Sequence, residues 1–157
     1  MIDKDRVLKE LLKILEKELA DAQAAASSAR DLAMQDDLKS EGKYDTRAIE
    51  ASYLAGAQQK RVEEIKMDIQ MLEELDLTPS NSVQLGSLVL IEHKGVERFY
   101  FISSTSGGTM LSIDEHTVLV ISVFSPLGNE ALSLSAGDSF EIETPKESRI
   151  YSIVAVA

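Results

Sequence analysis

The stretch MQDDLKSEGKYDTR, residues 34–47, lies between two long helical patterns and decides the fold. Three acids in it, Asp36, Asp37 and Glu41, lie within six positions of one another. The serine and glycine around the third acid favour a break in the helix. The sequence therefore predicts a helical hairpin whose bend carries a group of carboxylates.

Both helical patterns contain an apolar seam. Alternating steps of four and three from Leu8 meet apolar residues only, and the same steps backwards from Leu72 meet a single polar residue, Gln58. This spacing is typical of a coiled coil. The first seam comprises Leu8, Leu12, Leu15, Leu19, Ala22, Ala26, Ala29 and Ala33; the second comprises Leu72, Ile69, Ile65, Val62, Gln58, Ala55, Ala51 and Ala48.

The two seams mirror each other about residues 40–41. Leu8 is expected to face Leu72 at one end, and Ala33 to face Ala48 at the other. One antiparallel hairpin satisfies all the pairs, and it should taper because alanine lets the helices approach closely near the bend. Helices of about 28 residues reach roughly 40 Å. Such a rod is poorly suited to enclose a substrate and well suited to enter a channel.

The remainder of the chain is predicted to form a small β-rich domain. The stretch TPSNS after Leu77 breaks the helical pattern, and glycine-containing turn signals then separate short β-favouring runs. These runs predict an antiparallel sheet of five or six strands: SLVLIEH, RFYFIS, TMLSI, TVLVISVF, DSFEIET and RIYSIVAV. The segment 126–134 suits a short helix against that sheet, with Leu127, Ala131 and Leu132 turned inward.

The fold class expected from these elements is α+β. We expect an antiparallel coiled-coil hairpin over residues 1–76 with its acidic tip at 34–47. A linker over 77–82 and a C-terminal domain over 83–157 complete the predicted organisation.

Composition narrows the range of functions that the chain could have. The chain has 157 residues, no cysteine and a formal net charge of −11. Disulfides and cysteine-based zinc sites are thereby excluded, and strong independent binding to nucleic acid is disfavoured because such binding depends on clustered Lys and Arg. The sequence shows neither a signal-peptide core nor an apolar run long enough for a membrane span, so no membrane partner is expected and a cytoplasmic location is the default.

Residues suited to catalysis within this chain are scarce. His93 and His116 are the only histidines, each isolated from acids in sequence, and both are expected to be structural or surface residues. No nucleophile elbow or phosphate-binding loop is present. The tip carboxylates remain, and their hard oxygens suit Mg²⁺. They could complete a metal site that another macromolecule half supplies. The chemistry would then belong to that partner, and this chain would not be an enzyme in its own right.

Three segments resemble the Gre transcript-cleavage factors of bacteria, GreA and GreB. The tip DDLKSEGKY resembles the family's G-D-L-K-E-N-A-E-Y, and ISVFSPLGNEAL resembles I-S-x-x-S-P-[LIM]-x-x-x-L. LSAGDSFEIETPKESRIYSIVAV resembles the closing G-x-x-x-G-D-x-V-x-V-x-T-P stretch. The resemblance spans essentially the whole chain and implies a coiled-coil hairpin followed by an FKBP-like domain.

This resemblance implies a transcription elongation factor. The hairpin would enter the secondary channel of RNA polymerase, and the tip would share the catalytic Mg²⁺, so that the polymerase cleaves backtracked RNA. The factor would bind no cofactor alone and would contact nascent RNA only indirectly. By position, Asp37 matches the first tip acid, Lys39 and Tyr44 match partner-binding tip residues, and Ser125 and Pro126 fall on the loop that docks at the channel rim.

The chain departs from the family pattern at the tip and at the docking loop. Ser40 replaces the second catalytic acid, and Glu41 supplies an acid one position later, which swings the side chain by about 100° on a helix. Asp36 replaces a glycine and could compensate for the shifted acid. The metal ligands implied by the resemblance are Asp37 and Glu41. Phe124 stands where the family usually has Asp or Asn. Docking should survive these changes more readily than cleavage.

Two alternatives to a cleavage factor stay open. The chain could occupy the channel and modulate the polymerase without promoting cleavage. It could instead be an interaction module whose FKBP-like domain binds peptides or isomerises proline, unrelated to transcription. That domain has few aromatics for a prolyl pocket, and several of them are expected in the core by strand alternation. The six are Phe99, Tyr100, Phe101, Phe124, Phe140 and Tyr151.

Overall fold

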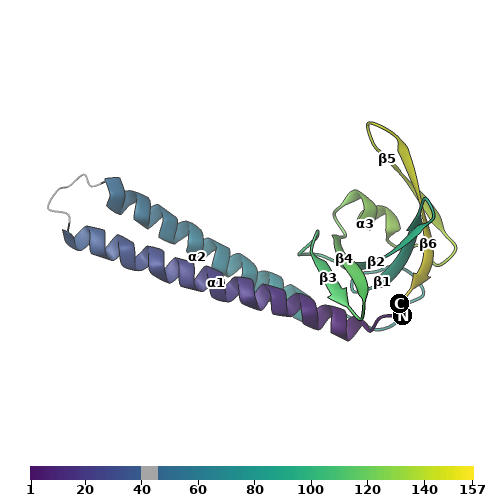
Figure 1. Ribbon diagram of the computed structural model, residues 1–157, viewed down its shortest axis with the longest axis horizontal. Helices are drawn as coiled ribbons and strands as arrows, with labels where there is room; N and C mark the ends of the chain where they lie inside the picture. The colour runs from purple at the N-terminus through teal and green to yellow at the C-terminus, as the bar shows by residue number, and fades with distance from the viewer. Residues whose placement is uncertain (40–45) are drawn as a thin grey trace. The chain divides into compact units, whose positions relative to one another are not determined.

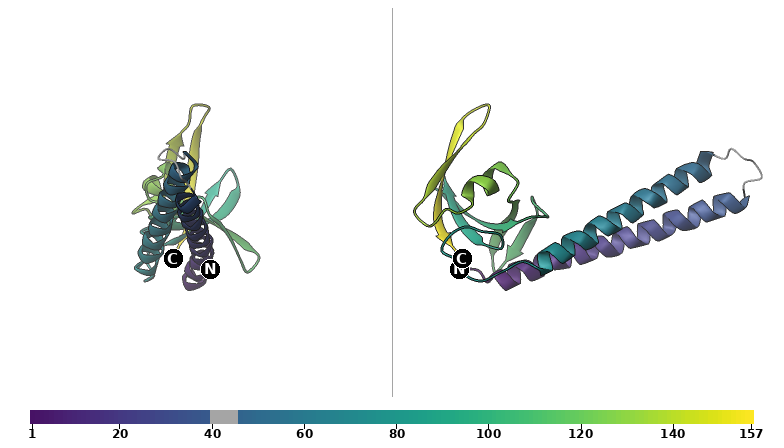
Figure 2. Two further views of the ribbon diagram at one scale, coloured as in Figure 1. Left: turned by 90° about the vertical axis from the view of Figure 1, so that its left-hand side faces the viewer. Right: turned by 180° about the vertical axis from the view of Figure 1, so that it is seen from behind.

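The computed structural model describes residues 1–39 and 46–157, and for residues 35–39 and 46–48 it describes the backbone only. Two long helices, α1 (Lys4–Lys39) and α2 (Thr46–Glu73), run antiparallel and side by side (Figure 1 and Figure 2). Neither these helices nor any other in the described ranges is long and apolar enough to span a membrane. The predicted helical hairpin is confirmed.

The interface between the helices follows the predicted seams over most of their length. Ala22 and Ala26 of α1 cluster with Val62 and Ile65 of α2, and Leu19 and Ile69 pack partly buried against them. Farther along α1, the seam alanines at positions 29 and 33 are also buried. Small residues on one helix against β-branched residues on the other allow close packing, which explains why the alanine-rich stretch of α1 is helical and buried.

At the start of α1 the predicted seam is wrong by one position. Val7 and Leu11 are fully buried there, whereas Leu8 and Leu12 are only half-buried. An α-helix has 3.6 residues per turn, so a line of burial drifts by about 20° per heptad relative to a strict seven-residue repeat. Positions 7, 8, 11 and 12 are all apolar, and this drift places Val7 and Leu11 on the buried side in place of Leu8 and Leu12.

The sheet contains all six predicted strands. Its order is β3-β4-β2-β1-β6-β5 (Figure 1). The strands are β1 (Leu88–His93), β2 (Val96–Ser103), β3 (Met110–Ile113), β4 (His116–Ser122), β5 (Ser139–Glu143) and β6 (Ser148–Val156). The α+β class is therefore confirmed.

The prediction of an all-antiparallel sheet is wrong at one pair. Strands β2 and β4 are parallel, with Phe101 opposite Val120, while the other four pairings are antiparallel. Strand β4 turns back from β3 and lies between β3 and β2, so it runs in the same direction as β2. Short β-favouring runs do not specify this order, because a simple meander would use the same runs.

Two tight turns set the register of the hairpins. Lys94 and Gly95 join β1 to β2, and Asp114 and Glu115 join β3 to β4, all four with positive φ. Two residues with positive φ match the right-handed twist of the strands they connect. The first turn carries a glycine and was predicted; the second has none and was not recognisable by that signal.

One face of the sheet packs against a short helix, α3 (Pro126–Ala131), and this packing forms the domain core. Ala131 is fully buried in the core, and Leu127 and Leu132 pack against it partly buried, as predicted. The helix is shorter than the predicted segment 126–134, since its C-cap Leu132 has φ −55° and ψ 138° and so leaves the helical conformation. Four of the six aromatics are buried: Tyr100, Phe101, Phe140 and Tyr151.

The described residues form two compact units, Lys13–Gln70 and Met1–Leu12 together with Met71–Ala157. In the second unit, the segment after α2 is tied to the start of α1. The ammonium of Lys4 donates to the backbone oxygen of Thr78 at 3.3 Å. Burial lowers the pKa of Lys4, and Asp76 opposes that effect. The predicted boundaries 1–76, 77–82 and 83–157 stay predictions.

The carboxylate of Asp76 gives this segment a pH dependence. Hydrogen bonds from the hydroxyl and the amide of Thr78, at 2.6 and 2.9 Å, and then Lys4 hold the pKa of Asp76 below its ordinary value of 3.8. The stabilisation that ionised Asp76 gives to the folded state is therefore present above pH 3.8 and is lost as the pH falls through the lowered pKa. We expect wild type to exceed Asp76→Asn in stability at pH 6, and this excess to shrink by pH 3.

Urea unfolding at several pH values measures that difference. A Thr78→Val variant, which removes the hydroxyl donor but keeps the amide, should show part of the same pH dependence. An unchanged difference between wild type and Asp76→Asn from pH 6 to pH 3 would contradict the assignment.

Candidate functional site

The predicted acidic tip lies at the end of α1 and beyond it. Asp36, Asp37 and Lys39 belong to the last turns of α1, whose backbone is described there. Glu41 and Tyr44 fall outside the described residues. Asp36 and Asp37 are thus placed close together at one end of the hairpin, and their oxygen donors are of the kind that Mg²⁺ accepts. Among the residues whose side chains the structure describes, no three His, Asp or Glu side chains lie close enough together to hold a metal ion.

Large apolar side chains are exposed on both helices close to the bend. Leu32 and Met34 lie on α1, and Ile49, Tyr53 and Leu54 lie on α2. Each is at least half exposed, and Tyr53 reaches 78%. Scattered exposed apolar residues are normal, but several near one end of a helical hairpin suit contact with a partner.

The second predicted site, Phe124-Ser125-Pro126, forms the start of α3. Ser125 is the N-cap: its Oγ accepts from the amide of Gly128 at 3.1 Å and donates to the backbone oxygen of Ser122 at 2.7 Å. Pro126 follows in the first turn, where its missing N–H is not needed. The loop is therefore held in one conformation by its own hydrogen bonds.

Phe124 is the most exposed large apolar side chain in the described part of the chain. Its backbone amide donates to Ser122 Oγ at 3.1 Å, while 83% of the residue is accessible to solvent. A rigid loop that holds an aromatic ring in solvent is typical of an interaction surface, where such rings contribute much of the binding energy.

Gly128 is required for this loop to close. A Cβ there would overlap the backbone oxygen of Ser122 and lie 2.8 Å from its carbon. The chain thus brings the end of β4 against the first turn of α3. In the sequence, nothing distinguishes this glycine except its place two residues after Pro126 within the quoted motif.

The two histidines have structural surroundings, as expected. His93 Nδ1 donates to the backbone oxygen of Ile150 at 2.9 Å. His116 packs edge-on against Phe99, with ring centroids 5.3 Å apart.

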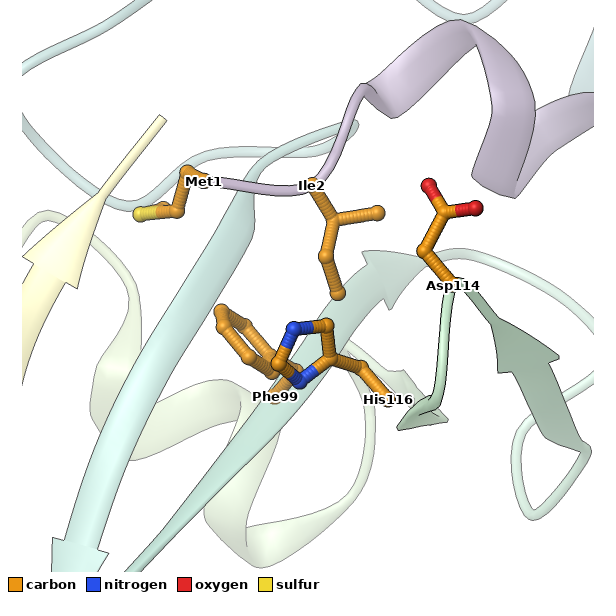
Figure 3. A pocket seen from close by; sticks show the side chains of 5 residues that line it. All are labelled: Met1, Ile2, Phe99, Asp114 and His116. Carbon is orange, nitrogen blue, oxygen red and sulfur yellow. The ribbon is translucent and has the colours of Figure 1, made fainter.

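His116 and the nearby Asp114 do not form a catalytic pair. Figure 3 shows His116, Phe99 and Asp114 around Ile2 of the N-terminal segment, in a cavity of about 380 Å³. Asp114 is ion-paired with Arg6 of α1. The cavity therefore marks where the N-terminal segment packs on the sheet.

Comparison with known families identifies the C-terminal part of the chain. Residues 78–157 match the family described as transcription elongation factor, GreA/GreB, C-terminal domain. The chain belongs to the GreA/GreB family. This match includes all six strands and α3, and with them the loop that carries Phe124 in this GreA/GreB protein.

Solved structures give more distant similarities for this GreA/GreB chain. GreA factor homolog 1 (Gfh1) of Thermus thermophilus is 22% identical, with a TM-score of 0.39, over 93% of this chain and 94% of that one. A GreA/GreB factor from Nitrosomonas europaea is 18% identical, with a TM-score of 0.38, over 82% and 92%. No curated protein sequence matches. The family assignment depends on residues 78–157.

Proposed function

We propose that this protein binds RNA polymerase through the secondary channel and stimulates cleavage of backtracked RNA by the polymerase's own active site. The helical hairpin supports this proposal most strongly. Its helices pack through small residues towards the bend, and α1 carries two adjacent acids, Asp36 and Asp37, in its last turn. The exposed apolar side chains beside the bend, with Tyr53 the most exposed, would be covered inside such a channel.

The chain's own residues would have separate roles in that complex. Phe124, Ser125 and Pro126 would dock at the channel rim, and Lys39 and Tyr44 would contact the channel near the tip. Asp37 and Glu41, with Asp36 beside them, would share a Mg²⁺ with the polymerase, a metal whose chemistry is to activate water and stabilise the transition state of phosphoryl transfer. The protein would position carboxylates, and the bond cleavage would belong to the polymerase.

A second candidate is a channel-binding modulator that does not promote cleavage. Ser40 favours it, because a hydroxyl stands where the family has its second acid. Both candidates require binding in the channel and differ in RNA shortening.

The test adds purified protein to stalled, backtracked elongation complexes and follows the length of the RNA. Shortening supports cleavage stimulation. Competition with a known channel binder without shortening supports modulation. Neither shortening nor competition would refute both candidates and leave the interaction-module alternative.

The docking assignment predicts a loss of binding for Phe124→Ala. Burial of an exposed aromatic ring at an interface centre typically contributes about 2 kcal/mol or more, so the Kd for polymerase should rise at least about tenfold. Fluorescence competition against a labelled channel binder measures this change.

Met110→Ala provides the matched control for that measurement. Met110 is 68% exposed on β3 of the same sheet, and its loss should leave the Kd unchanged. Equal effects of the two substitutions would remove the docking assignment.

A further inference from the structure

Basic side chains of the C-terminal region are concentrated in one cavity. Residues 77–157 contain nine acids and only four Lys or Arg, yet three of those four bases line a cavity of about 290 Å³ on the sheet. The lining residues are Ile91, His93, Lys94, Val96, Arg98, Tyr100, Arg149 and Tyr151. An acidic protein that gathers its few bases around a hollow presents a local site for an anion.

Strand alternation explains how these side chains meet. In the β1–β2 hairpin, Ile91 pairs with Arg98 and His93 pairs with Val96, so these side chains share one face of the sheet. Ile91 also pairs with Ile153 of β6, and residues 151 and 149 follow on that face at steps of two. The intervening acids Glu92 and Glu97 pair with each other and point to the opposite face.

The cavity is separate from the docking loop. It lies at the β1–β2 turn, where β2 begins. Strand β4 runs parallel to β2 and ends at Ser122, just before α3. The loop of Phe124 and the cavity thus lie towards opposite ends of these strands, so a ligand in the cavity need not compete with docking.

The charge in the cavity is only partly balanced. Glu147 accepts from Lys94 Nζ at 3.3 Å and from Arg149 Nε at 3.2 Å, and these hydrogen bonds hold the pKa of Glu147 below its usual range. Lys94 and Arg149 share this one carboxylate, and Arg98 also lines the cavity, so three positive charges stand against one negative charge and leave an excess of about two. A phosphate monoester carries about −1.5 to −2 charges at pH 7, whereas a single carboxylate would leave part of the excess.

An aromatic stack ends at the cavity. The rings of His93 and Tyr151 lie 4.5 Å apart at 23°, and those of Tyr151 and Phe140 lie 5.3 Å apart at 15°. Tyr151 and Phe140 are buried, while His93 at the end of the stack is partly exposed and fixed by its bond to the Ile150 oxygen. A planar ring can extend such a stack, because the face of a base or other planar ring stacks favourably on an aromatic side chain.

We propose that this cavity binds a small phosphate ester that carries a planar ring, with the phosphate held by Arg98, Arg149 and Lys94 and the ring stacked on His93. Guanidinium groups match phosphate oxygens in a two-pronged geometry, and Lys adds a point charge. The volume is near the lower limit for small-molecule sites, which suits a ligand no larger than a mononucleotide.

Calorimetric titration with adenosine 5′-monophosphate, inorganic phosphate and adenosine tests the proposal on the full chain. The monophosphate should bind at least about tenfold more tightly than either fragment. Arg98→Gln should weaken that binding at least about tenfold. Lys146→Gln, which removes the fourth base of this region from outside the cavity, should leave it unchanged.

His93→Ala separates the two parts of the site. It should weaken binding of the monophosphate and leave binding of inorganic phosphate unchanged, and thermal unfolding of each variant checks that the sheet is intact. The proposal is overturned if the monophosphate binds no more tightly than inorganic phosphate, or if Arg98→Gln and Lys146→Gln behave alike. It is also overturned if no binding is detected.

Discussion

An Asp37→Asn variant is expected to lose RNA cleavage by tenfold to a hundredfold while its affinity for polymerase is unchanged. Asn has nearly the same size as Asp but carries no negative charge, so it cannot replace a carboxylate beside a metal. Loss of one group that supports a metal site typically costs about 10–100-fold. Binding should persist because Phe124 and the α3 loop remain intact. RNA shortening in backtracked complexes and competition for the channel measure the two quantities separately.

Asp31→Asn is the matched control for that variant. Asp31 is an exposed acid on α1, about 1.7 turns before Asp37, and its loss changes the net charge of the hairpin by the same amount. It should retain cleavage. Equal losses for the two variants would attribute the effect to general charge and not to the tip. Full cleavage activity in the Asp37→Asn variant would show that residues other than Asp37 carry the function of the tip.

Replacing Gly128 with Ala is expected to destabilise the sheet domain by about 1–3 kcal/mol, the usual cost of forcing an extra methyl into a packed site. The new Cβ would collide with the backbone oxygen of Ser122, which is fixed at the end of β4 and cannot yield as a flexible side chain would. Either α3 or the β4 end must shift. The hydrogen bond from Gly128 to Ser125 Oγ would then weaken, and polymerase binding through Phe124 should fall with it.

Urea unfolding of the variant measures the destabilisation, and the amide NMR shifts of residues 122–128 report the displacement of the loop. Asn129→Ala is the control, because Asn129 lies on the exposed side of the same short helix. That change should have little effect on stability. A Gly128→Ala protein as stable as Asn129→Ala would show that the α3 turn adapts without cost.

Local patterns predicted the secondary structure well, and pairing between distant segments was harder to predict. The hairpin seam around Ala26 and Val62 could be predicted because both helices repeat the same spacing. The parallel pairing of β2 with β4 could not, because it depends on which edge β4 approaches, and its own residues suit either neighbour. The burial of Val7 in place of Leu8 follows from helix drift, which a strict heptad pattern ignores.

The candidate sites show the same limit. The α3 loop was singled out by its resemblance to a short family motif, and Ser125 of that motif is the N-cap of α3, while the docking role of Phe124 and Ser125 stays a prediction. The basic cavity was missed because Arg98 and Arg149 are far apart in sequence and meet only once β1 is known to lie between β2 and β6. Alternation within one strand indicated which side chains share a face, but the order of strands was needed to bring those faces together.

The position of β6 has a consequence for association between chains. This strand lies between β1 and β5, and Leu88 and Ala157 exchange backbone hydrogen bonds at 3.1 and 2.9 Å. Without β6, strand β1 would have one free edge and β5 would have no neighbour. Unpaired edges of that kind invite association with other chains. The pairing of β6 on both of its sides therefore protects two edges at once from association with other chains.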